Sequence, residues 1–109
     1  MLVKEGQVDA RAYNQLDVFE ATVKFARTEG TIPAPEPAHA IKAVIDEALR
    51  CKKTGEEKTL LFLLCGHGHF DMQAYDDYFG GKLPPYEYPE KEIKRSVKML
   101  RELYPWLEG

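Results

Sequence analysis

The segment Thr59-Leu60-Leu61-Phe62-Leu63-Leu64-Cys65 is apolar at every position after the first, and Gly66-His67-Gly68-His69-Phe70-Asp71 follows it directly. A run that is apolar on both faces is typical of a strand buried from both sides, as in a parallel sheet that helices cover. The charged residues 56–58 before the run and Gly66 after it favour a strand over a buried helix. The run therefore predicts a central strand of an α/β fold.

The segments around this strand have the apolar spacing of helices. Asn14 is placed to cap a first helix, and Gly55 is placed to end a second. Two further helices are expected after Asp71 and after Pro89, and alternation over residues 8–13 predicts a short second strand. The fold class expected is α/β, with a partial parallel sheet and covering helices. Because two strands are marginal alone, we expect a piece of a larger doubly wound sheet.

Composition excludes several classes of protein. The chain has 109 residues, 15 Lys and Arg against 18 Asp and Glu, and a net charge of −3. Without a basic stripe, no nucleic acid is expected as a partner. The longest apolar run is far too short to span a membrane, and residues 1–6 lack the pattern of a signal peptide. Two cysteines do not form a disulfide framework, so we expect a cytoplasmic protein.

The residues after the apolar run form a candidate site. In open α/β sheets, ligands bind beyond the carboxyl ends of the strands, where Cys65, Gly66 and His67 would lie. Cys65, His67, His69 and Asp71 are possible metal ligands. Alternate residues diverge in an extended chain, however, and no second Cys/His cluster completes the set, so no metal is expected. The competing interpretation is that both histidines are hydrogen-bonding loop residues.

Glu36 and the thiol of Cys65 each allow two interpretations. Glu36 either caps the second helix, with Pro37 as its first residue, or is an acid that a stiff proline-rich loop places in a cleft. A reactive thiolate at Cys65 would need a nearby base or a helix N-terminus. A buried inert thiol, or a weak hydrogen-bond donor, is the simpler expectation.

Two stretches make the sequence similar to the tryptophan synthase β chains: residues 25–40 (FARTEGTIPAPEPAHA) and residues 63–71 (LLCGHGHFD). The likeness runs over residues 2–83 and is greatest to the second, stand-alone type of β chain. It implies a lyase of the pyridoxal-phosphate (PLP) fold-type II class, which joins L-serine to indole to form L-tryptophan. By this resemblance Glu36 is the catalytic glutamate beside the cofactor ring. Cys65 replaces a serine that hydrogen-bonds the pyridine nitrogen, and Gly66 and His67 lie with it at the cofactor.

The sequence also departs from that family. The Schiff-base lysine follows a histidine in the family, and here no lysine follows any histidine. The family's glycine-rich phosphate loop is absent as well. The resemblance therefore implies a C-terminal segment, residues 1–83, with an appended loop and helix at 84–109. Such a segment is expected to be inactive alone and to bind PLP weakly or only with a complementary N-terminal β-chain polypeptide. The alternative is a non-catalytic binding or assembly module derived from the same fold.

The apolar run has a further consequence for association. Burying residues 60–64 on both faces needs more surface than two helices supply. We therefore expect a homo-oligomer, or a complex with the complementary polypeptide, formed through sheet edges or swapped helices.

Overall fold

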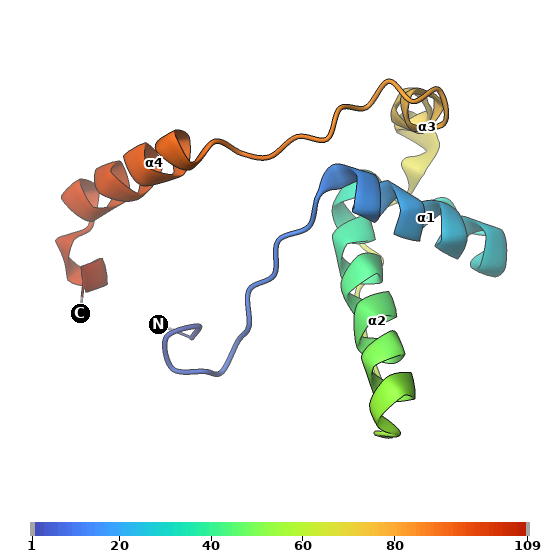
Figure 1. Cartoon of the computed structure of the whole chain (residues 1–109), viewed down its shortest axis with the longest axis horizontal. Coiled ribbons are helices and arrows are strands. Elements are labelled where there is room, and N and C mark those ends of the chain that lie inside the picture. Colours follow the sequence, from blue (N-terminus) through green and yellow to red (C-terminus); the bar gives the residue numbers. More distant parts are fainter. Residues whose placement is uncertain (1, 109) are drawn as a thin grey trace.

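The fold is described for residues 2–108 by a computed structural model. Its helices are α1 (Gln15–Glu29), α2 (Pro35–Thr54), α3 (Met72–Phe79) and α4 (Glu90–Leu103), with 3-10 turns η1 (Gly68–Phe70) and η2 (Pro105–Glu108). Helices α1, α2 and α3 form one body, whereas α4 lies at the far end of a linker without helix or strand (Figure 1). The candidate site residues all belong to the body.

The core of the body lies where α1 crosses α2 and meets α3. Buried apolar side chains come from all three helices: Val18, Phe19, Ala21, Ala38, Ile41 and Tyr75. The predicted cap is confirmed, because Asn14 Oδ1 accepts a hydrogen bond from the Leu16 N–H at 3.0 Å. The predicted end of α2 is confirmed too. Gly55 has φ 75°, which favours glycine, and its N–H donates to the Cys51 carbonyl at 2.8 Å.

The predicted parallel sheet is wrong for the described part of the chain. Residues 2–108 contain no strand, neither at 8–13 nor at 59–65, and their one β pairing is an isolated antiparallel bridge between Pro33 and His67. A strand exists through the hydrogen-bond ladder to its neighbours, and nothing in the described chain runs alongside residues 59–65 to form one. Leu61 and Leu63 are consequently 91% and 77% exposed.

Residues 56–66 are nevertheless extended, for a geometric reason. Gly55 ends α2, yet the Gly66 carbonyl accepts a hydrogen bond from the N–H of Ala34, the residue before α2 begins. A helix of 20 residues is about 30 Å long, and about 11 residues reach at most about 36–40 Å. Residues 56–66, the return segment, must therefore be nearly fully extended to span the length of α2. Phe62 anchors it, with its ring 5.9 Å from that of Phe25.

An ion-pair cluster at the surface holds the start of this return segment. Glu47 on α2 contacts Arg50 at 2.7 Å and Lys58 at 3.1 Å, and Arg50 also contacts Glu56 at 2.6 Å. Hydrogen bonds from Arg50 and then Lys58 lower the pKa of Glu47 to about 2. The cluster is solvated, so it orients the segment more than it stabilises the fold.

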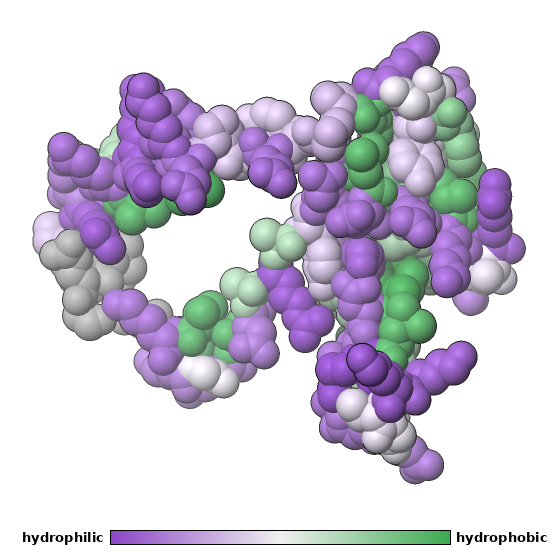
Figure 2. All heavy atoms as spheres, in the orientation of Figure 1, coloured by the Kyte–Doolittle hydropathy of each residue, from purple (hydrophilic) through white to green (hydrophobic). Residues whose placement is uncertain are grey.

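The described chain is open for its size. Its accessible surface is 8802 Å², whereas a compact monomer of 12.5 kDa exposes about 6,200 Å². Its radius of gyration is 17.1 Å, against about 13 Å for a compact domain of this length. Figure 2 shows apolar side chains open to solvent on α4 and on the body. Within residues 2–108, no helix combines the length and the apolar character that crossing a membrane requires.

Candidate functional site

The two loops that carry the sequence motifs lie side by side. Ala34 N–H donates to the Gly66 carbonyl at 3.2 Å, and Gly68 N–H donates to the Ile32 carbonyl at 2.8 Å. Pro33 and His67 form the bridge between these two bonds. The loop that leads to Glu36 is thus fastened to the segment that carries Cys65, Gly66 and His67, which lies some thirty residues later in the chain.

Gly68 permits this close approach of the two loops. A Cβ atom at Gly68 would lie 2.6 Å from the Pro33 carbonyl oxygen and 2.9 Å from Ile32 Cγ2. No side chain fits there without moving backbone. The Tyr75 hydroxyl of α3 donates a hydrogen bond to the same Pro33 carbonyl. Helix α3 is thus attached to the loop that leads to Glu36.

Tyr75 is the buried polar group on which this arrangement depends, and it yields a pH prediction. It is 4% exposed, and burial, followed by the charge of Asp71, raises its pKa to about 12. Because the folded-state pKa lies above the unfolded value near 10, the neutral phenol stabilises the fold. That contribution is complete below pH 10 and is lost as the pH rises through 12. In an ultraviolet titration, one of the six tyrosines should ionise about 2 pH units above the ordinary tyrosine value.

Tyr75→Phe is the control for this titration, and it should remove the late step alone. Ionisation of all the tyrosines together near pH 10, while the chain is still folded, would contradict the buried hydrogen bond.

Glu36 lies in the first turn of α2 but does not cap it. The helix begins at Pro35 rather than at Pro37, its N-cap is Ala34, and no side chain makes a capping hydrogen bond. The interpretation of Glu36 as the cap is therefore wrong. The Ala34 N–H is bonded to the neighbouring loop instead, and prolines at the first and third positions remove two other donors that have no partner in a first turn. Glu36 is left exposed, with its carboxylate free for another role.

Cys65 is an exposed free thiol, so the expectation of a buried one is wrong. It loses burial because the apolar run it ends has no neighbouring strands. His67 is a hydrogen-bonding loop residue: its Nδ1 accepts from the His69 N–H at 3.4 Å, and the two rings are 4.9 Å apart. In the region that the structure describes, no three His, Cys, Asp or Glu side chains gather closely enough to hold a metal ion.

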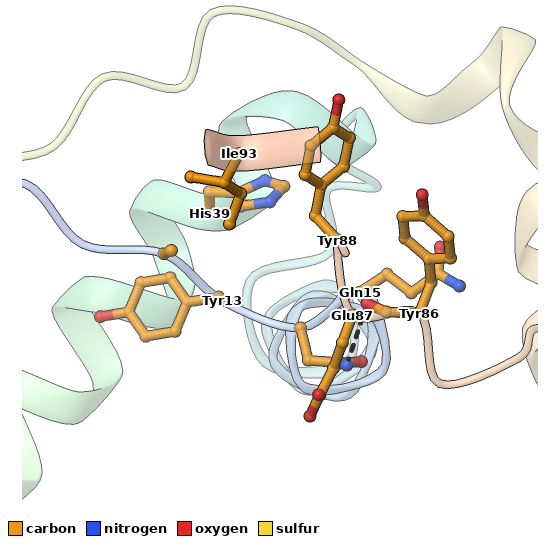
Figure 3. A pocket seen from close by; sticks show the side chains of 9 residues that line it. Tyr13, Gln15, His39, Tyr86, Glu87, Tyr88 and Ile93 are labelled. Atoms are coloured by element: carbon orange, nitrogen blue, oxygen red, sulfur yellow. Dashed lines mark hydrogen bonds between the residues drawn. The ribbon is translucent and has the colours of Figure 1, made fainter. Parts of the chain in front are cut away.

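A shallow groove of about 560 Å³ lies beside His39 of α2, and the sequence did not suggest it (Figure 3). His39 lines it, three residues after Glu36 and so on the same side of the helix. Its Nδ1 lies 3.1 Å from the Pro35 carbonyl, as expected of a helix residue that bonds locally. Tyr13, Tyr86 and Tyr88 line the groove as well.

The linker after α3 forms one side of this groove, with Tyr86, Glu87 and Tyr88 among the lining residues. Gln15 Nε2 donates to the Pro84 carbonyl at 2.6 Å, and Asn14 Nδ2 lies 3.5 Å from the Tyr86 carbonyl. The pattern Pro-Pro-Tyr-Glu-Tyr-Pro at 84–89 was the available signal, since aromatic residues in a proline-stiffened segment favour contact with a surface. Neither this groove nor the three smaller hollows that border α1 are lined by Glu36, Cys65 or His67.

Comparison with known proteins identifies the lineage of this arrangement. The chain is 68% identical over 78 residues to "Tryptophan synthase beta chain 2" of Aquifex aeolicus, covering 72% of this chain and 18% of that protein. It is 62% identical over 82 residues to the protein of the same name from Methanosarcina acetivorans, covering 75% and 19%. The Pyrococcus abyssi protein of that name is 50% identical over 94 residues, covering 86% and 21%. No model of a protein family matches the sequence.

The chain spans about a fifth of the length of these relatives. Identities of 50–68% over most of the chain are far beyond what a shared fold class produces. The chain is therefore homologous, over most of its length, to one part of the tryptophan synthase β chains.

Proposed function

We propose that this chain supplies the cofactor-ring side of a tryptophan synthase β-type active site, which a second polypeptide completes. The reaction is the condensation of L-serine with indole to L-tryptophan and water. One observation supports this most strongly: the loop that leads to Glu36 and the Cys65–Gly66–His67 segment are hydrogen-bonded to each other. Because these two segments are neighbours, Glu36 and Cys65 are able to serve one cofactor.

Glu36 is the proposed general acid and base of this site. It occupies the first turn of α2, where the helix dipole favours a carboxylate, and it makes no capping bond. A rigid start to the helix, with Pro35 and Pro37 in the first turn, fixes the direction in which the side chain leaves the backbone. In this role Glu36 takes and returns a proton at the substrate as indole replaces the serine hydroxyl.

The residues present fit one edge of PLP and not the whole cofactor. The Cys65 thiol is exposed and has no hydrogen-bond partner in the described chain, so it is available to donate to the pyridine nitrogen. Gly66 and His67 would lie against the ring beside it. PLP, when bound, supplies the electron sink for replacement at the β-carbon of serine. A neutral thiol leaves the ring nitrogen largely unprotonated, and the ring then withdraws electrons less strongly.

The lysine and the phosphate loop must come from the complementary polypeptide. No lysine follows a histidine in this chain, and no glycine- and serine-rich loop is present. The apolar residues 60–64 give that polypeptide a strand to pair with, because Leu61 and Leu63 are exposed and their backbone is extended. Alone, the chain is proposed to be inactive. The alternative is a module that binds through the same exposed segment without catalysing a reaction.

The role of Cys65 can be tested through cofactor affinity. The chain is mixed with the A. aeolicus β chain 2 from which the matching segment has been deleted, and PLP binding is measured by absorbance titration and native mass spectrometry. Losing one hydrogen bond costs about 0.5–1.5 kcal/mol, so Cys65→Ala should weaken PLP binding by about 2–10-fold. Cys65→Ser should bind PLP at least as tightly as the native chain.

Cys51→Ala is the matched control, since Cys51 lies at the far end of α2. It should leave PLP affinity unchanged. Equal affinities for the native chain, Cys65→Ala and Cys65→Ser would show that the thiol does not meet the cofactor.

A further inference from the structure

Helix α4 has a narrow apolar stripe with a basic opposite side. Ile93, Val97 and Leu100 follow one another at spacings of four and three residues, which places them on one side of the helix, and Tyr104 follows at its C-cap. All four are exposed, with Val97 the least at 39%. The other side carries the basic residues: Lys91, Lys94, Arg95, Lys98 and Arg101. This is the pattern of a helix that lies on another surface.

In the described structure α4 has no such surface beneath it. Beyond its first turn, where Ile93 borders the tyrosine-lined groove, α4 packs chiefly against η2, which follows it, among the described elements. Its own body is hard to reach, because Gln15 and Asn14 hold the linker at residues 84 and 86. Only residues 87–89 remain before α4 begins, about 10 Å of chain, and they end in a proline. Figure 1 shows α4 leaving the body on this linker.

A surface of matching character lies between α1 and α2. Two adjoining hollows of about 440 and 150 Å³ share Lys24 and Ile45. Their floor is apolar, formed by Ala21, Phe25, Ile41, Val44, Ile45, Leu49 and Phe62. The polar residues on their edges are four acids, Asp17, Glu20, Glu29 and Asp46, against two lysines, Lys24 and Lys42. Lys42 pairs with Asp46 and lies near Asp17, whereas Glu20 and Glu29 make no described ion pair. We call this surface the α1/α2 groove.

Charge favours a second copy as the occupant. Helix α4 has five basic and three acidic residues, so its net charge is 5 − 3 = +2. The rest of the chain has 10 basic and 15 acidic residues, so its net charge is −5. Antiparallel pairing of two α4 helices is disfavoured, because Lys94 of one would face Arg101 of the other. A basic helix instead complements the acid-edged groove.

The area available is sufficient for such a dimer. The chain exposes roughly 2,600 Å² more than a compact monomer of its mass, and a stable interface buries about 800 Å² per partner. We propose that α4 of one copy docks by its apolar stripe into the α1/α2 groove of a second copy, and that the exchange is reciprocal. Of residues 60–64 only Phe62 borders this groove, and the proposal does not rest on the catalytic role.

The first test is the oligomeric state of the full chain, by light scattering and native mass spectrometry over a concentration series. The native chain should dimerise, and Val97→Asp should raise the dissociation constant at least tenfold. Met99→Asp is the matched control: it also places a carboxylate on α4, but outside the stripe, and should change the constant by less than threefold. Circular dichroism verifies that both variants stay helical. A native chain that stays monomeric at high concentration overturns the proposal, as does dissociation by both variants alike.

The second test identifies the docking surface. A photoreactive benzoylphenylalanine replaces Tyr104, and ¹⁴N- and ¹⁵N-labelled chains are mixed before irradiation. The proposal predicts cross-links that join a light α4 to heavy peptides from residues 17–29 or 41–49, and the reverse. Cross-links found only within one chain, or only between two α4 helices, would overturn it.

Discussion

Replacing Glu36 by alanine is expected to lower the rate of tryptophan formation by about 10²–10⁴-fold in the assembled enzyme, the range typical of losing a general acid or base. The assembly is this chain together with a relative from which the matching segment has been removed. The physical reason is that Glu36 is exposed in the first turn of α2 and serves no structural bond there. Its removal should therefore cost catalysis and little stability. The rate is measured with L-serine and indole at saturating concentrations.

Two variants make this expectation specific. Glu36→Gln keeps the shape but cannot carry the proton, so it should be nearly as inactive as Glu36→Ala. Glu57→Ala removes another exposed carboxylate, one that makes no described ion pair, and should retain full activity. If Glu36→Ala kept more than about a tenth of the native rate, Glu36 would not be the acid–base group. The alternative of a non-catalytic module would then be favoured.

Gly68→Ala is expected to destabilise the isolated chain by about 3 kcal/mol, at the upper end of the cost of overpacking. The added methyl would lie 2.6 Å from the Pro33 carbonyl oxygen and 3.1 Å from the Tyr75 ring. The backbone atom cannot retreat without breaking the Gly68–Ile32 hydrogen bond, and Tyr75 is held by its own bond to Pro33. Urea unfolding followed by circular dichroism measures the change as a lower midpoint.

Gly66→Ala is the matched control, two residues earlier in the same segment. Its methyl would meet only the Ala34 Cβ at 3.3 Å and the edge of Pro37 at 3.9 Å. Neither Gly66 nor Gly68 has a positive φ, so backbone strain does not distinguish them. We expect Gly66→Ala to cost less than about 1 kcal/mol. Equal losses for the two variants would mean that the loops do not pack as closely as described.

The helices could be predicted from the sequence because their determinants are local. The Asn14 cap, the Gly55 stop and the apolar spacing each act within a few residues, and all three were correct. The start of α2 was misplaced by two residues. Ala34 has no side-chain oxygen to signal a cap, and the bond that replaces the cap comes from Gly66, a residue far along the chain.

The sheet could not be predicted correctly because its existence depends on other segments. Residues 59–65 have the composition of a strand buried from both sides, and in the described chain they are extended, with most of them exposed and only Leu60 and Phe62 half-buried. Apolar composition shows that a segment is suited to burial, but it does not show that neighbouring strands are present to bury it. The pairing of the Glu36 loop with the Cys65 segment was likewise implied only by resemblance. It depends on Gly68 and Tyr75, whose contacts are non-local.

The most direct test of the account is a complementation titration. A β chain 2 lacking the matching segment is held at fixed concentration, this chain is added, and tryptophan formation from L-serine and indole is recorded with PLP present. The account predicts no activity from either polypeptide alone and a saturable rise that levels off at one chain per partner. Binding of the two polypeptides, verified by native mass spectrometry, without any tryptophan formation would contradict it.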